Sequence, residues 1–84
     1  MAGILKNFDA LVQFLAPSHN SSRRISPSTF AGFYKVWGRD NREAPMRLIT
    51  PLRKNELHSH FEIKTLDHTA NTYYALAAVV ACGL

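Results

Sequence analysis

The sequence is poor in cysteine, in export signals and in long apolar runs, and each shortage excludes a class of protein. It has one cysteine, so neither a disulfide framework nor a cysteine-based zinc site is possible within one chain, which fits a reducing, cytoplasmic setting. Residues 1–15 contain Asp9 and lack the basic start of a signal peptide. The most apolar stretch, over 72–82, is too short to cross a bilayer, so no membrane partner is expected.

Positive charge is in modest excess and is spread along the chain. A net charge of +4 favours anionic ligands. Basic residues are adjacent only at Arg23-Arg24 and Arg53-Lys54, so the clustering that nucleic-acid-binding proteins usually show is absent from the sequence. With 84 residues, of which 46% are hydrophobic and 19% charged, the chain is one small globular domain at most. A domain of this size buries little more than ~60% of its unfolded surface and is marginally stable.

Hydrophobic periodicity and turn residues divide the chain into helices, strands and loops. Apolar residues recur at helical spacing from Ile4 to Leu15, and Pro17 stops that helix. The predicted elements are a helix over 4–15, a polar loop over 18–29, strands over 33–37, 43–50 and 57–65, turns over 38–41 and 67–71, a charged hairpin loop over 51–56, and a helix over 72–82. The predicted fold class is α+β, with a helix, a long loop, a three-stranded antiparallel sheet and a buried C-terminal helix.

The predicted C-terminal helix is apolar almost all round. It has no polar face between Tyr73 and Cys82, and Gly83 follows it as a natural residue at a helix end. A helix without a polar face is normally buried on every side. We therefore expect something larger than this chain to surround the helix, which indicates a fragment or an obligate assembly.

Two segments carry most of the chemistry. Asn41–Arg47 places Arg42 and Arg47 close together, as suits a phosphate or carboxylate ligand, although both are equally typical of solvated surface arginines. The predicted strand over 57–65 alternates apolar and polar residues. Such a polar face is either ordinary solvent-facing surface or the floor of a polar active site. Its ionisable side chains are those of His58, His60, Glu62 and Lys64.

Two other ligand classes fit single features of these segments and are not favoured. Alternate residues on a strand can converge on one metal, so His58 and His60 together with Glu62 could bind zinc, but no further partner is evident. The aromatic side chains within 33–37 could stack on single-stranded nucleic acid, but aromatic strands are usually core.

Five segments, in order and at compatible spacing, resemble the C-terminal part of the catalytic domain of the glutamine synthetase family. The Trp37-Gly38 pair before Asn41-Arg42 is similar to the glutamine-synthetase-like and γ-glutamyl-amine ligase branches. The segments are residues 2–5 at a helix start, 16–24 in a loop with proline, asparagine and arginine, 37–47 around Asn41-Arg42, 60–64 in an acid-bearing strand, and 70–78 at the entry of an alanine-rich helix.

The resemblance implies an ATP-dependent ligase that activates glutamate as γ-glutamyl phosphate, which ammonia or an amine then attacks. Phosphoryl transfer depends mainly on positioning and charge neutralisation, which suits arginines and the Mg²⁺ or Mn²⁺ that would accompany ATP. By position, the implied roles are catalysis and contact with phosphate and glutamate for Arg42, glutamate binding for Arg24 and Lys64, nucleotide phosphate binding for Arg47, and metal binding for Glu62.

Three positions depart from the family's pattern. Phe30 stands where ammonia-using members carry a glutamate, which indicates a bulkier amine acceptor or lost activity. Lys64 replaces an arginine, so a bidentate fork becomes a point charge. His60 also stands where many members carry an arginine, and it could help only when protonated.

The resemblance also implies that residues 1–84 are a partial catalytic domain. The family's N-terminal β-domain and much of its active site lie upstream of the matched part. The chain alone is therefore expected to be inactive, and it is not expected to form the ring-shaped homo-oligomers of the family. An alternative of a different class is a non-catalytic truncated homologue that acts, if at all, as an interaction or scaffold piece.

Overall fold

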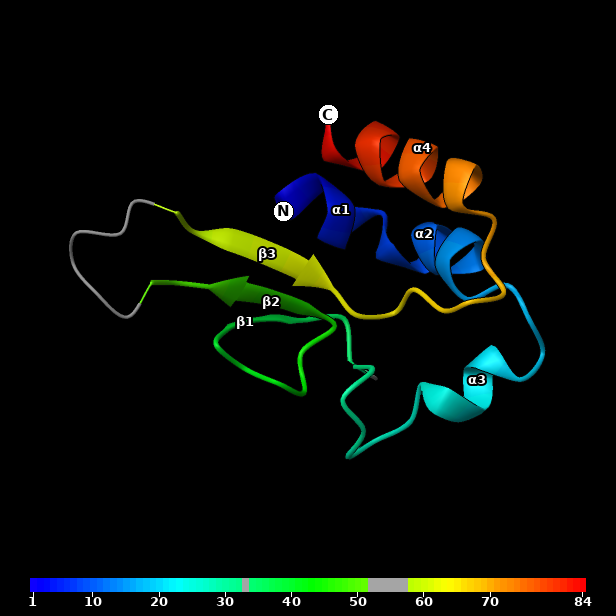
Figure 1. Cartoon of the computed structure of the whole chain (residues 1–84), viewed down its shortest axis with the longest axis horizontal. Coiled ribbons are helices and arrows are strands. Elements are labelled where there is room, and N and C mark those ends of the chain that lie inside the picture. The colour runs from blue at the N-terminus through cyan, green and yellow to red at the C-terminus, as the bar shows by residue number, and fades with distance from the viewer. Residues whose placement is uncertain (33, 52–57) are drawn as a thin grey trace.

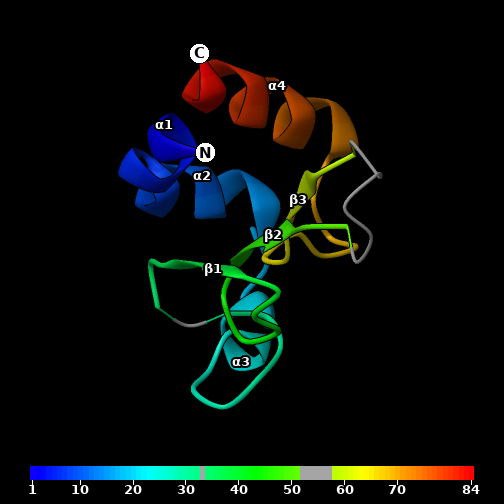
Figure 2. The same ribbon diagram turned by 90° about the vertical axis from the view of Figure 1, so that its left-hand side faces the viewer.

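A computed structural model describes residues 1–32, 34–51 and 58–84. The chain folds into three packed helices beside a small sheet, with a further one-turn helix apart from them (Figure 1). The elements are α1 (Ala2–Lys6), α2 (Phe8–Leu15), α3 (Ser21–Arg24), β1 (Trp37–Arg39), β2 (Met46–Ile49), β3 (His60–Ile63) and α4 (Thr72–Gly83). The turned view shows α1, α2 and α4 on one side of the sheet and α3 on the other (Figure 2). The predicted α+β class is confirmed.

The predicted helix over 4–15 is confirmed, with a break at Asn7 that divides it into α1 and α2. The Asn7 side-chain amide donates to the carbonyl oxygen of Gly3 at 3.0 Å, so this residue ends one helix and begins the next. The stripe predicted from periodicity is the core of the molecule, joined by one side chain from β2 and one from α4. Its buried members are Ile4, Phe8, Leu11, Leu15, Met46 and Ala75.

The predicted helix over 72–82 is confirmed as α4, which continues to Gly83. The side chain of Asn71 accepts hydrogen bonds from the backbone of Tyr73 and Tyr74 and so caps the helix. Among the described residues, α1 and α2 cover one side of α4: Ala75 is buried, whereas Tyr73 is 85% exposed. This chain does not bury the helix on every side, and the expected larger surrounding stays a prediction. No helix within the described ranges has the length and apolar character needed to cross a membrane.

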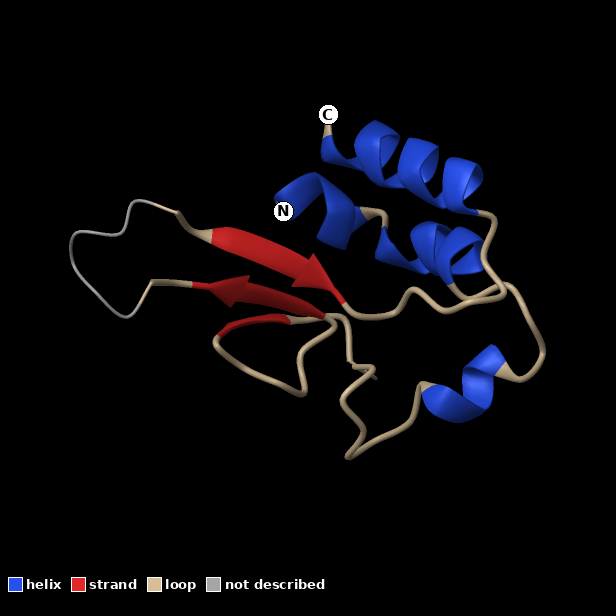
Figure 3. Ribbon diagram, in the orientation of Figure 1, coloured by secondary structure: helices blue, strands red, loops and turns tan. Residues whose placement is uncertain are grey.

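The predicted polar loop over 18–29 contains the short helix α3, so that part of the prediction is wrong (Figure 3). The side chains of Ser18 and Ser21 hydrogen-bond each other at 2.8 Å, and each also accepts from the other's backbone nitrogen. These bonds satisfy donors at the start of the turn. A serine-rich stretch looks like a loop because the same hydroxyl groups stabilise turns and helix starts alike.

The sheet has the order β1-β2-β3 and is mixed, so an antiparallel arrangement throughout is wrong. The β2 and β3 strands pair antiparallel as predicted, but β1 runs parallel to β2. Residues 40–45 turn back along the sheet instead of forming a hairpin. Asp40 adopts a left-handed φ of 52° there, which aspartate tolerates, and its backbone nitrogen donates to Leu48.

The predicted strand boundaries also needed correction. The strand expected over 33–37 is wrong, because β1 begins at Trp37 and includes two residues of the predicted turn over 38–41. Residue 33 lies outside the described residues. The strands expected over 43–50 and 57–65 are shortened to β2 and β3, with residue 57 undescribed. The hairpin loop predicted over 51–56 lies outside the described residues except for Pro51.

Candidate functional site

The central strand β2 and its neighbour β3 place Arg47 directly opposite Glu62. These residues are partners in the antiparallel register of β2 and β3, and Arg47 Nη2 lies 2.8 Å from Glu62 Oε2. Met46 and Ile63, the neighbouring pair, pack with the helical core. Because side chains alternate along a strand, the ion pair lies on the sheet face that points away from α1, α2 and α4.

The Arg47 guanidinium controls the ionisation of Glu62. Its hydrogen bond holds the pKa of the Glu62 carboxyl below the ordinary value, and the positive charges of Lys64 and His60 act in the same direction, while desolvation opposes them. The carboxylate therefore stays ionised at neutral pH. Arg47 Nε is shielded from solvent and has no hydrogen-bond partner among the described residues.

Lys64 follows β3 directly and joins the same face two residues after Glu62. Its backbone nitrogen donates to the carbonyl oxygen of Pro45 at 2.9 Å, so the backbone pairing continues one residue beyond the ends of β2 and β3. Lys64 Nζ is shielded from solvent and has no hydrogen-bond partner within the described residues. Desolvation, followed by the charge of Arg47, lowers the pKa of Lys64. We name Arg47, Glu62 and Lys64 the charged face.

Arg42 lies on the loop before β2, close enough for its charge to act on Lys64. Its side chain is exposed, and its positive charge contributes to the lowered pKa of Lys64, which Glu43 opposes. The structure therefore brings Arg42, Arg47, Glu62 and Lys64 into one electrostatic environment. The alternation predicted for the strand over 57–65 placed Glu62 and Lys64 on one face, and the ion pair of Glu62 with Arg47 and the effect of the Arg47 charge on Lys64 agree with that placement.

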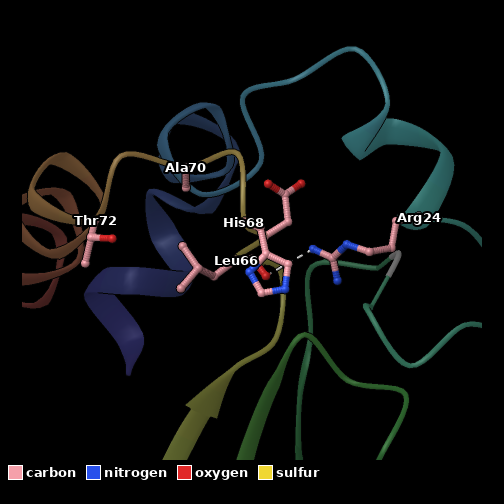
Figure 4. A pocket seen from close by; sticks show the side chains of 6 residues that line it. Arg24, Leu66, His68, Ala70 and Thr72 are labelled. Atoms are coloured by element: carbon pink, nitrogen blue, oxygen red, sulfur yellow. Dashed lines mark hydrogen bonds between the residues drawn. The ribbon is translucent and has the colours of Figure 1, made fainter.

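Arg24 reaches the same end of β3 from α3, but its guanidinium contacts backbone. It donates to the carbonyl oxygens of Lys64, Thr65 and Leu66 at 3.3, 2.6 and 3.3 Å. Figure 4 shows the side chain extended toward Leu66, with His68 beside it. The cavity drawn there has a volume of about 380 Å³ and is lined by Arg24, Leu66, Asp67, His68, Ala70 and Thr72.

The whole chain, residues 1–84, matches the family model described as glutamine synthetase, catalytic domain. The chain belongs to the glutamine synthetase family. This confirms the resemblance drawn from the five sequence segments, which are distributed between residues 2 and 78 of the matched range.

Glutamine synthetases and a polyamine synthetase are among the proteins that the chain resembles. It is 41% identical to a γ-glutamylpolyamine synthetase, GlnA3, of Streptomyces coelicolor over 100% of the chain and 18% of that protein. It is 36% identical to type-1 glutamine synthetase 1 of Dictyostelium discoideum over 99% of the chain and 17% of that protein. It is 38% identical to a glutamine synthetase of Pyrococcus furiosus over 100% of the chain and 18% of that protein. The chain thus spans less than a fifth of the length of these relatives.

Glu62 has the ligand chemistry that the divalent metal of a glutamine synthetase would need, but it is one ligand. A carboxylate suits a hard cation, and the lowered pKa keeps this one charged. Within 1–32, 34–51 and 58–84, no group of three or more His, Cys, Asp or Glu residues is arranged to hold a metal ion. A metal on Glu62 would therefore need ligands from outside the described residues.

Asp67 has a role that the sequence does not predict, since its place in the turn over 67–71 gives no sign of a distant partner. Its carboxylate accepts hydrogen bonds from the hydroxyl of Ser21 and from the backbone and hydroxyl of Thr69, and these lower its pKa to about 2. The backbone nitrogen of Asp67 also donates a hydrogen bond to the carbonyl oxygen of Leu15. Asp67 ties α3 to the segment that follows β3. The Asp-x-Thr spacing signals the local turn, whereas the bond to Ser21 joins residues far apart in the sequence.

Proposed function

We propose that residues 1–84 are the C-terminal portion of the catalytic domain of an ATP-dependent ligase that joins glutamate to ammonia or an amine through γ-glutamyl phosphate. The observation that carries the proposal is the charged face, where Arg47 and Glu62 pair at 2.8 Å and the Lys64 ammonium has no hydrogen-bond partner among the described residues. The family match over residues 1–84 supports the reaction class. The proposed substrates are glutamate, ATP and an amine or ammonia, and the proposed location is the cytoplasm.

Phosphoryl transfer requires positive charge around the phosphate and an ionised metal ligand, and the charged face offers both. We assign Arg42 to the transferring phosphate and the glutamate, and Arg47 to the nucleotide phosphates. The bond between Arg47 and Glu62 orients both groups, because each restricts the rotamers of the other. A Mg²⁺ or Mn²⁺ ion held by Glu62 and by ligands from outside this chain would add positive charge at the phosphates.

We assign Lys64 and Arg24 to the glutamate carboxylate. The Lys64 ammonium has no hydrogen-bond partner among the described residues, and it would bind a carboxylate that displaces the groups shielding it. Arg24 is committed to three backbone carbonyls, so it would bind glutamate only with donors that these bonds leave available. It also fixes the backbone of Lys64, since one of those carbonyls belongs to that residue.

We propose an organic amine as the acceptor. The ring of Phe30 is 69% exposed beside the charged face, and it offers an apolar surface to an alkyl chain instead of a carboxylate to ammonium. The similarity to a γ-glutamylpolyamine synthetase supports this choice.

The chain alone is proposed to be inactive and not to form a ring. The described residues contribute a single carboxylate to the charged face, and the chain spans less than a fifth of its relatives. The activity is therefore best tested in a chimera in which these 84 residues replace the matching segment of the Streptomyces protein.

The assay is phosphate release from ATP with glutamate and either ammonia or a diamine. We expect turnover with the diamine, a loss of at least tenfold in Arg47→Gln and in Glu62→Gln, and little change in Arg23→Gln, a matched exposed arginine on α3. A chimera that folds and assembles like its parent yet turns over neither acceptor would refute the proposal.

The second candidate is a non-catalytic piece that binds other proteins. The exposed apolar side of α4 favours it, with Tyr73, Tyr74, Leu76 and Val80 all largely exposed. An inactive but well-folded chimera, together with binding of the chain to an intact relative in a pull-down that Leu76→Asp abolishes, would support this candidate over the ligase.

A further inference from the structure

The Lys64 ammonium is the group of the charged face that lacks an ion-pair partner at hydrogen-bond distance among the described residues. Arg47 and Glu62 are paired with each other, whereas Lys64 Nζ is shielded from solvent and has no hydrogen-bond partner within the described ranges. Removing a cation from water without such a partner costs free energy, so another contact must compensate.

Among the described residues, the charges of Glu62 and Glu43 attract the ammonium, and the ring of Phe30 adds a direct contact. Lys64 Nζ lies over this ring, 6.0 Å from its centroid. The face of an aromatic ring attracts a cation but accepts no conventional hydrogen bond, so the contact leaves the three N–H donors of the ammonium unpaired.

The backbone of Lys64 is held on both sides. Its nitrogen donates to Pro45 and its carbonyl oxygen accepts from Arg24. The start of the side chain is therefore fixed at the end of β3, and the ring of Phe30 determines where the ammonium lies.

We propose that Phe30 is a positioning residue, whose ring holds the Lys64 ammonium beside the Arg47–Glu62 pair with its donors unpaired, so that they bind an oxyanion that displaces the groups shielding them. This inference rests on the proposed function, and it assigns a role to a side chain that lies outside the sheet. The ligand chemistry is that of a carboxylate or a phosphate, either of which accepts these donors.

Three substitutions separate the effect of the aromatic face of Phe30 from the effect of its volume. Phe30→Leu keeps the apolar volume and removes the aromatic face, whereas Phe30→Tyr keeps the ring. Phe14→Leu is the matched control, because Phe14 is a half-exposed phenylalanine on α2, away from the charged face. None of the three changes the net charge, so general attraction of anions is the same in all of them.

The experiment measures two properties of the full chain in solution. Proton NMR follows the ε-methylene signal of Lys64, identified by its loss in Lys64→Gln, because a ring above the side chain shifts this signal upfield. Calorimetric titrations with pyrophosphate and with glutamate then distinguish a phosphate from a carboxylate ligand.

We expect the upfield shift in the wild-type, Phe30→Tyr and Phe14→Leu chains and its loss in Phe30→Leu. The same Phe30→Leu change should weaken binding of the preferred oxyanion about two- to fivefold, as loss of a cation–π contact predicts. The role of Phe30 is overturned if the Lys64 signal of Phe30→Leu stays at the wild-type position. It is also overturned if the upfield shift is lost but the affinity for the oxyanion equals that of wild type. If the wild-type chain binds neither probe, the proposed oxyanion site itself fails, while the Lys64 signal still reports whether the ring positions the ammonium.

Discussion

The contact between α1 and α4 makes Gly3→Ala the sharpest test of the packing. Gly3 is a helical residue that faces the last turn of α4, and a Cβ built on it would lie 2.3 Å from the carbonyl oxygen of Cys82. The obstructing atom belongs to the backbone, so no side-chain rotation relieves the contact. One helix must move away from the other.

Two effects of the substitution oppose each other. Alanine in place of glycine stabilises a helix by up to about 1 kcal/mol, since it lowers the conformational entropy of the unfolded chain. Forcing apart a packed contact costs about 1–3 kcal/mol. Because the shift needed at Cys82 is large for a backbone atom, we expect the second effect to dominate and the free energy of unfolding to fall by about 1–2 kcal/mol.

Urea titration followed by helical circular dichroism measures this change. With a slope of about 1 kcal/mol per molar urea for a small domain, the midpoint should fall by about 1–2 M. Gly83→Ala is the control, because its Cβ would meet only the Ile4 side chain at an ordinary 3.9 Å. The control should leave the midpoint unchanged or raise it. A Gly3→Ala midpoint at or above wild type would refute the packing argument.

Two further predictions use the same titration. Gly32→Ala should lower the free energy of unfolding by about 1–3 kcal/mol, because Gly32 has φ 82° and an added Cβ would lie 2.5 Å from the backbone of Pro45; an unchanged midpoint would contradict this. Hydrogen bonds lower the folded-state pKa of Asp67 to about 2 from 3.8, so its contribution is present above pH ~4 and is lost as the pH falls through 2. The stability difference between wild type and Asp67→Asn should therefore shrink between pH 5 and pH 2, and a constant difference would show that the carboxylate bonds do not stabilise the fold.

Local sequence patterns predicted the two main helices: helical periodicity for residues 4–15 and a continuous apolar run for residues 72–82. The stripe from Ile4 to Leu15 and the apolar run after Asn71 were both correct in place and type. The break at Asn7 was not visible, because it comes from one side-chain bond back to Gly3. The exposure of α4 depends on which surfaces surround it, so no pattern within the helix could reveal it.

The first strand shows where local reasoning failed. An aromatic run over 33–37 has strand propensity, yet the strand starts at Trp37 and runs through the glycine that was assigned to a turn. Strand pairing is a long-range property: the hydrogen bond from Asp40 to Leu48, and the parallel register of β1 on β2, decide which residues form the ladder.

For the candidate site, the sequence by itself determined the residue types, the family and the common face of Glu62 and Lys64, because alternation along a strand is a local property. Only the tertiary structure decided that Arg47 pairs with Glu62, that Arg24 is committed to backbone carbonyls, and that Phe30 lies under Lys64. The physical reason is that register and packing bring together groups distant in sequence, and those partners, more than the residue types, set the charge and the availability of each side chain.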